Sequence, residues 1–175
     1  MTYAFTLTDI IPAEPRTIYD TWLDSRGHTA MTGGKAKMSN KLGADVSAWD
    51  GYIFGKNVVL EPGKRIVQTW RTTRFTEADP DSKITVTLVA VDDGTELTLH
   101  HAGVPDEHKG YENGGWQTHY FDPMKKYFGE AKHAKQKSAK RRPKRKPAKA
   151  EAKKARTIKK RAKAKKRKSA KRRRR

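Results

Sequence analysis

Cysteine does not occur in this chain of 175 residues, which excludes disulfides, thiolate metal sites and a cysteine nucleophile. Long apolar runs are also missing, since no segment approaches the roughly 18 apolar residues that a membrane-spanning helix needs. The N-terminal residues contain neither a basic cluster nor an apolar core, so we expect no signal peptide. These absences predict a soluble, cytoplasmic protein.

Aromatic residues and acids are scarce in the C-terminal part of the chain. Every Trp, Tyr and Phe lies at or before Phe128. Residues 132–175 hold 26 Lys and Arg but one acid, Glu151, whereas residues 1–131 hold 14 Lys and Arg against 18 acids. The formal charges of the two parts are therefore +25 and −4. This division predicts a folded domain over residues 1–131 and a polybasic tail over residues 132–175.

The tail contains too little apolar surface to fold alone. Ordering a residue costs roughly 1–2 kcal/mol, so we expect residues 132–175 to be disordered when free. Its Lys, Ala and Pro content resembles the tails of linker histones. Cationic side chains that neutralise phosphates release counterions, which predicts salt-sensitive binding to DNA or RNA without sequence preference.

The residues predicted to bind nucleic acid are Lys140, Arg141, Arg142, Lys144, Arg145, Lys146, Lys153, Lys154, Lys159, Lys160, Arg161, Lys165, Lys166, Arg167, Lys168, Lys171, Arg172, Arg173, Arg174 and Arg175. In a bacterium this tail predicts association with the nucleoid. Two alternatives remain open: binding to a membrane surface or another polyanion, and a solubilising role without a dedicated partner.

Alternating apolar and polar residues in the domain are typical of strands. The predicted strands cover residues 3–9, 37–40, 46–49, 51–60, 65–71, 83–91 and 95–101. In the last two strands one face carries Ile84, Val86, Leu88, Ala90, Leu97, Leu99 and His101. Short helices are predicted at residues 15–23 and 25–31. Residues 103–105 are predicted to break the sheet.

A long amphipathic helix is predicted over residues 113–129, because its aromatic and apolar residues recur every three or four positions. That stripe comprises Trp116, Tyr120, Met124, Tyr127 and Phe128. Pro123 lies inside the helix and is predicted to kink it. The order of elements predicts an α+β domain in which this helix covers one face of an antiparallel sheet.

A series of short motifs resembles one known family. They are residues 51–55 (GYIFG), 61–70 (EPGKRIVQTW), 94–101 (GTELTLHH), 103–105 (GVP) and 114–116 (GGW). Their order and spacing over about residues 5–128 resemble the activator of heat-shock protein 90 ATPase homologues. That family belongs to the START-related, polyketide-cyclase-like superfamily of helix-grip folds.

This resemblance implies a curved antiparallel sheet wrapped around a long C-terminal helix, with an apolar cavity between them. It does not imply one activity, since the superfamily includes lipid and hormone carriers, cyclases and domains of unknown role. The eukaryotic co-chaperones of the family have an additional N-terminal domain that docks on the chaperone. We find no such domain in this sequence, and the cationic tail is a departure from the family pattern.

The implied cavity is the main candidate site of the domain. Its predicted lining is Tyr52, Phe54, Trp70, Leu88, Leu97, Leu99, His101, Trp116, Tyr120 and Met124. Ordinary core packing is the alternative for each of them. A shift of strand register by one residue would exchange His101 for His100.

No catalytic constellation is recognisable in the sequence. His100 and His101 are adjacent on a strand and point to opposite faces, and no histidine spacing matches a zinc motif. His101 or His119 would be the acid or base of an enzyme that used the cavity. We predict no metal and no cofactor.

The sequence thus predicts a non-enzymatic binding protein, with a cavity for a small hydrophobic ligand or a protein partner and a tail tethered to nucleic acid. The alternatives are a cyclase- or hydrolase-type enzyme that uses the same cavity, and a minimal co-chaperone of the heat-shock ATPase.

Overall fold

A single antiparallel sheet organises the domain. The computed structural model describes the backbone of residues 1–141 and the side chains of residues 1–131. The six strands have the spatial order β1-β6-β5-β4-β3-β2. Their bounds are β1 Thr2–Ile11, β2 Asp45–Ala48, β3 Ile53–Glu61, β4 Arg65–Thr72, β5 Ser82–Val91 and β6 Gly94–Pro105. Each paired neighbour runs antiparallel, as the predicted hairpins require.

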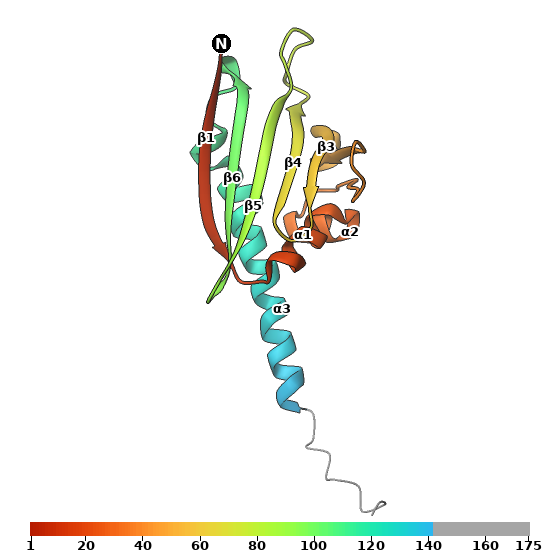
Figure 1. Ribbon diagram of the computed structural model, residues 1–175, viewed down its shortest axis with the longest axis vertical. Helices are drawn as coiled ribbons and strands as arrows, with labels where there is room; N and C mark the ends of the chain where they lie inside the picture. Colours follow the sequence, from red (N-terminus) through yellow and green to blue (C-terminus); the bar gives the residue numbers. More distant parts are fainter. Residues whose placement is uncertain (142–175) are drawn as a thin grey trace, which may run out of the picture. The chain divides into compact units, whose positions relative to one another are not determined.

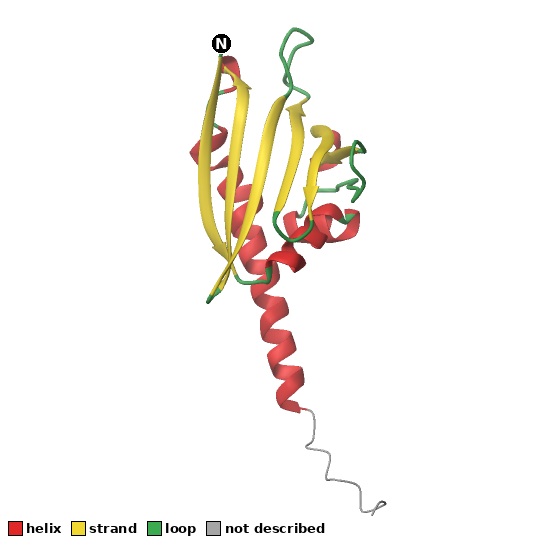
Figure 2. Ribbon diagram, in the orientation of Figure 1, coloured by secondary structure: helices red, strands yellow, loops and turns green. Residues whose placement is uncertain are grey.

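Helices cover one face of this sheet. Figures 1 and 2 show α3 (Asp122–Arg141) crossing behind the strands, with α1 (Pro15–Leu23) and α2 (Ser25–Thr32) beside it. Pro15 occupies the first turn of α1, where a missing N–H costs nothing. Asp24 accepts a hydrogen bond from the Gly27 amide at 2.6 Å and so caps α2.

The predicted strand over residues 37–40 is wrong. Only Lys37 forms a β-bridge there, with Ser47. The strand predicted at residues 46–49 ends one residue earlier, because Trp49 begins the 3-10 turn η1 (Trp49–Gly51) with a φ of 53°. The same turn delays the start of β3 to Ile53.

The prediction that residues 103–105 break the sheet is also wrong. The register of β1 against β6 passes from Ala4 opposite Ala102 to Tyr3 opposite Val104, which leaves Gly103 as a bulge. Gly103 has a φ of +74°, a conformation that glycine adopts without strain. The strand therefore continues to Pro105.

The predicted long helix is interrupted at its N-terminal end. Three short turns precede α3, namely η2 (Asp106–His108), η3 (Tyr111–Gly115) and η4 (Gln117–Phe121). Within η3 the chain leaves helical geometry at Asn113 and Gly114. The π-helical η4 leads directly into α3, where Pro123 lies in the first turn and needs no kink. α3 then continues past Gly129 to Arg141 through a stretch rich in Lys and Ala, which favour helix.

The hydrophobic core lies between the sheet and the helical layer. On the inward face of β5 and β6 the side chains of Ile84, Val86, Leu97 and Leu99 are buried. Ala90, near the hairpin turn, was predicted on the same face but is exposed. A buried polar chain crosses this core from the Trp22 indole through Gln68 to Asn57, with donor–acceptor distances of 3.2 and 2.8 Å. These bonds connect α1 to β4 and β3.

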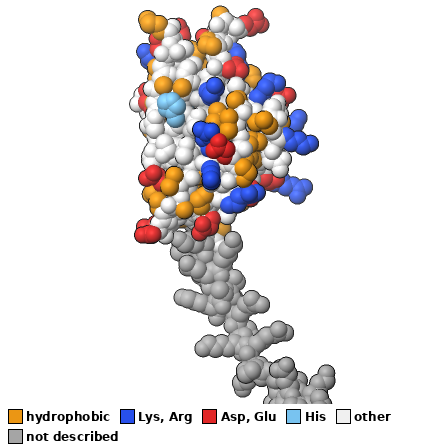
Figure 3. Space-filling model, viewed as in Figure 1, with side chains coloured by type: hydrophobic (Ala, Val, Ile, Leu, Met, Phe, Trp, Pro, Cys, Tyr) orange, Lys and Arg blue, Asp and Glu red, His pale blue; other side chains and the backbone are white. Residues whose placement is uncertain are grey.

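The opposite face of the sheet is turned to solvent. Figure 3 shows acidic and basic side chains interspersed on the face that it presents, with hydrophobic side chains between them. Phe54 and Val58 of β3 are among the exposed hydrophobic residues. None of the helices within residues 1–141 is long and apolar enough to cross a membrane.

Two glycines provide a matched test of these contacts. A Cβ at Gly55 would overlap the carbonyl oxygen of Thr69, whereas a Cβ at Gly129 of α3 would lie in ordinary contact, 3.9 Å from Pro12. We expect Gly55→Ala to lower the free energy of unfolding by about 2–3 kcal/mol. Gly129→Ala should raise it by roughly 0.5–1 kcal/mol, because alanine favours helix. Urea denaturation of both variants measures the two changes. Equal effects would contradict the close contact between Gly55 and the Thr69 backbone.

Candidate ligand-binding cavity

An aromatic cavity of about 440 Å³ opens between the start of β3, β4 and the helical turns before α3. Its lining is Trp49, Tyr52, Ile53, Trp70, Tyr111, Gly115, Trp116, His119 and Tyr120. Seven of these nine residues carry aromatic rings, counting the imidazole of His119, and none carries a carboxylate. The volume falls within the roughly 300–1,000 Å³ that is usual for small-molecule sites.

Ring-to-ring contacts hold the walls together. The ring centroids of Trp116 and Tyr120 lie 4.6 Å apart, and Tyr120 stacks on Trp22 of α1 at 5.4 Å. Trp70 contacts Tyr111 edge-on at 5.1 Å. Such pairs contribute about 0.5–1.5 kcal/mol each beyond their buried area, so the walls are stiff and preformed.

Trp49 reaches the cavity because of the local backbone. Its φ of 53° and that of Asp50, 56°, turn the chain sharply between β2 and β3. The Trp49 ring then lies edge-on to His119, with centroids 4.9 Å apart. A Cβ at Gly34 would come within 2.6 Å of the Trp49 indole, so glycine at position 34 leaves room for this ring.

Behind the cavity wall, His101 is completely buried and fully hydrogen-bonded. The Trp116 indole donates to its Nδ1 at 3.4 Å, and its Nε2 lies 2.9 Å from Ser82 Oγ. Since Nδ1 accepts, we assign the proton to Nε2, which donates to Ser82 Oγ. The Ser82 hydroxyl in turn donates to the carbonyl oxygen of Trp70 at 2.5 Å. Burial lowers the pKa of His101 to about 3, so the imidazole stays neutral at physiological pH.

This arrangement does not resemble an activated nucleophile. A serine nucleophile needs a base that accepts its proton, whereas Ser82 gives its proton to a backbone carbonyl. Both Ser82 and His101 are buried, with at most 1% of either residue exposed. The pair therefore joins β5, β6 and the Trp70 backbone structurally.

The phenols of Tyr111 and Tyr120 are also neutral. Burial raises the pKa of Tyr120 far above its ordinary value, and burial likewise raises the pKa of Tyr111. The Tyr111 hydroxyl lies 3.5 Å from Thr72 Oγ. The wall thus offers aromatic surface with a few neutral polar atoms.

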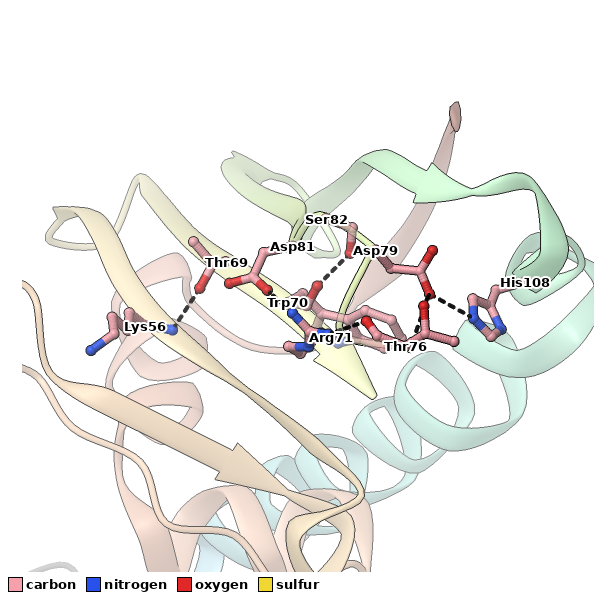
Figure 4. A network of polar contacts seen from close by, with 9 residues as sticks. All are labelled: Lys56, Thr69, Trp70, Arg71, Thr76, Asp79, Asp81, Ser82 and His108. Atoms are coloured by element: carbon pink, nitrogen blue, oxygen red, sulfur yellow. Dashed lines mark hydrogen bonds and ion pairs between the residues drawn. The ribbon is translucent and has the colours of Figure 1, made fainter. Parts of the chain in front are cut away.

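The β4–β5 loop is fastened beside this wall, as Figure 4 shows. Arg71 pairs with Asp81 at 2.7 Å and donates to the Thr76 carbonyl at 2.9 Å. Phe75 of the loop stacks on His108 of η2 with centroids 4.7 Å apart and lies 6.0 Å from Trp70. The loop thereby packs against Trp70, one of the residues of the cavity wall.

The structure distributes the ten predicted lining residues over three environments. Four lie on the cavity wall: Tyr52, Trp70, Trp116 and Tyr120. Five lie in the core behind it: Leu88, Leu97, Leu99, His101 and Met124. Phe54 lies on the opposite, exposed face, because alternation along β3 directs Ile53 inward and Phe54 outward.

Five wall residues lie outside the predicted lining: Trp49, Ile53, Tyr111, Gly115 and His119, the last of which the sequence indicates only as an acid or base. A signal for Tyr111 was its position just before the glycines that interrupt the helix. No local pattern indicates Trp49, since its placement depends on a left-handed turn. The residues predicted to bind nucleic acid, from Lys140 onward, lie outside the residues whose side chains are described, as does the predicted tail beyond Arg141.

Metal ligands do not gather anywhere in the described part of the chain. No group of three or more His, Asp or Glu residues is suitably arranged to hold a metal ion there. The candidate site of the domain is therefore the aromatic cavity.

Several curated proteins resemble this chain. Over 128 residues it is 28% identical to the human "Activator of 90 kDa heat shock protein ATPase homolog 1", covering 73% of this chain and 38% of that protein. Over 126 residues it is 31% identical to the Dictyostelium discoideum "Activator of 90 kDa heat shock protein ATPase homolog", covering 70% and 32%. The chain thus spans about a third of the length of these relatives.

The fold also matches a crystal structure titled as an HSP90 activator from Plasmodium falciparum. The TM-score is 0.64 at 23% identity, over 72% of this chain and 96% of that one. This likeness supports the helix-grip fold that the motifs implied. The sequence profile described as "Activator of Hsp90 ATPase homolog 1-like protein" matches residues 12–129. Because this match covers more than half of the sequence, the chain belongs to the Activator of Hsp90 ATPase homolog 1-like family.

Proposed function

We propose that this chain is a non-enzymatic binding protein, whose cavity holds a small hydrophobic ligand and whose tail tethers it to nucleic acid. The observation that carries the first part is the aromatic wall of a cavity of about 440 Å³. Rings that already contact one another lose little conformational entropy when a ligand enters. A flat apolar molecule would gain contact with several of them at once.

The chemistry of the wall favours binding over catalysis. No carboxylate lines the cavity, and the phenols of Tyr111 and Tyr120 have raised pKa values. The neighbouring Ser82–His101 pair is occupied by structural hydrogen bonds. His119 provides the one imidazole of the lining, and its ring packs edge-on against the Trp49 ring.

A variant that fills the cavity tests the ligand proposal. Gly115 lines the cavity, a Cβ there would meet open space, and its φ is not positive. Gly115→Leu should therefore fold normally and place a leucine side chain in the space that the probe would occupy. We expect the affinity for the neutral fluorescent probe N-phenyl-1-naphthylamine to fall by about tenfold or more, because the excluded probe surface loses apolar contact worth about 1.5–3 kcal/mol.

The matched control is Gly129→Ala, which lies in α3 outside the cavity lining. It should bind the probe like the unmodified chain, while circular dichroism and thermal unfolding verify that both variants are folded. Equal affinity of Gly115→Leu and the unmodified chain would exclude the cavity as the probe's site.

The tether proposal follows from the separation of charge along the sequence. Residues 132–175 carry +25 and residues 1–131 carry −4. A tail of this kind binds phosphates through many weak contacts, while the mildly acidic domain has no electrostatic reason to do so. In a bacterium this would hold the protein at the nucleoid.

Deletion of residues 132–175 should abolish binding to duplex DNA and leave the domain folded, because the last buried aromatic residue is Phe128. Binding by the full chain should fall by a factor of roughly 10³–10⁵ between 50 and 200 mM salt if six to ten phosphates are contacted. A gel-shift assay with two unrelated duplexes measures both effects. Retention of either duplex by the truncated chain would contradict the tether.

Association with a heat-shock ATPase is the second candidate, favoured by the names of the relatives. Since the matched segment covers only 38% and 32% of those relatives, their activity is a hypothesis for this chain. The prediction is that residues 1–131 alone retain an Hsp90 protein in a pull-down and raise its ATPase rate. Association that disappears with the tail would instead be ascribed to non-specific charge.

A further inference from the structure

The lining of the cavity carries no carboxylate, since it includes no Asp or Glu, and a cation lies beside it. Arg74, in the loop after β4, places its guanidinium carbon 6.0 Å from the centroid of the Tyr52 ring. Burial raises the pKa of Tyr111, and the nearby charge of Arg74 opposes that rise, so Arg74 is close to the phenols of Tyr52 and Tyr111.

Arg74 differs from Arg16, Arg65 and Arg71, each of which has an acidic partner. Arg16, Arg65 and Arg71 form ion pairs with Asp20, Glu61 and Asp81. Within the described residues Arg74 forms no ion pair. Its backbone is nevertheless fixed, since its amide donates to Thr72 Oγ at 3.3 Å, and the same oxygen lies 3.5 Å from the Tyr111 hydroxyl. A guanidinium on a fixed backbone at the rim of the cavity is thus free to bind an anion.

The walls decide the shape of the remaining part of the ligand. The faces and edges of Trp70, Tyr111, Trp116 and Tyr120 surround the space, and such surfaces favour a planar ring by stacking and edge contacts. Aromatic walls also attract cations, with roughly 0.5–2 kcal/mol per contact. This cavity has no carboxylate in its lining to pair with a cation, and Arg74 would repel one. The charge at the rim therefore disfavours cationic ligands.

We propose that the ligand is a planar aromatic carboxylate, with its ring in the cavity and its carboxylate paired with Arg74. This inference rests on the proposed ligand-binding function and specifies its ligand class. A guanidinium can form a bidentate pair with one carboxylate. Arg74 is the one unpaired cation identified at this rim among the described residues, so a ligand with one carboxylate suits it. The carboxylate remains close to water, so its desolvation is limited.

The test uses the full chain and three probes of one shape: 2-naphthoate, 2-naphthalenemethanol and the cation (2-naphthylmethyl)trimethylammonium. Each competes with N-phenyl-1-naphthylamine, whose fluorescence reports occupancy of the cavity, so naphthoate bound to the tail is silent. At about 0.15 M salt, where exposed charges are screened beyond about 8 Å, 2-naphthoate should compete best and the cation least.

Arg74→Gln should weaken competition by 2-naphthoate about three- to tenfold, as expected for a partly exposed charge pair, and leave 2-naphthalenemethanol unchanged. The matched control is Arg26→Gln, since Arg26 is an exposed arginine of α2 that lies outside the cavity lining. That variant should resemble the unmodified chain with all three probes.

The outcomes separate the two proposals. If N-phenyl-1-naphthylamine and all three probes fail to bind, or if Gly115→Leu leaves their binding intact, the proposed ligand-binding function is wrong. If the probes bind but the carboxylate has no advantage over the alcohol, or Arg74→Gln changes nothing, the inference of an aromatic carboxylate is overturned and the binding function stands.

Discussion

The neutral imidazole of His101 is the constraint on which the cavity depends. It accepts a hydrogen bond from Trp116 in the helical layer and donates to Ser82 of β5, which in turn binds the carbonyl of Trp70 in β4. Three strands and the helical turns are therefore joined through one buried ring. Because burial lowers its pKa to about 3, this connection carries no charge at physiological pH and needs no counterion in the core.

That connection gives the aromatic wall its continuity. Trp70 and Trp116 are the two cavity residues held by the His101 network, and rings extend from them through Tyr120 to Trp22 of α1. On the far side, the Trp22 indole begins the buried polar chain through Gln68 and Asn57. The cavity wall is therefore a continuation of the folded core, and a ligand would meet a surface that the fold has already ordered.

Much of the fold could be predicted because its strongest signals are local. Alternation in β5 and β6 indicated the inward face, and the helical spacing of Trp116 and Tyr120 brought both to the cavity. The errors lie where tertiary contacts override local pattern. A bulge at Gly103 extends β6, the left-handed turn at Trp49 shifts the start of β3 and leaves Phe54 outside, and the break at Gly114 brings Tyr111 to the wall. These three backbone features leave no mark on the two-residue or 3.6-residue periodicity of the sequence, from which strands and helices were predicted.

Position 34 shows how a residue outside the cavity shapes its wall. Gly34 follows α2 and does not line the cavity, yet its missing side chain provides the space in which the Trp49 indole rests. A methyl group there would displace that ring, which lies edge-on to the ring of His119 in the cavity wall. A residue that does not line the cavity therefore fixes the position of one of its wall rings, because any side chain at position 34 would push the Trp49 indole out of its place.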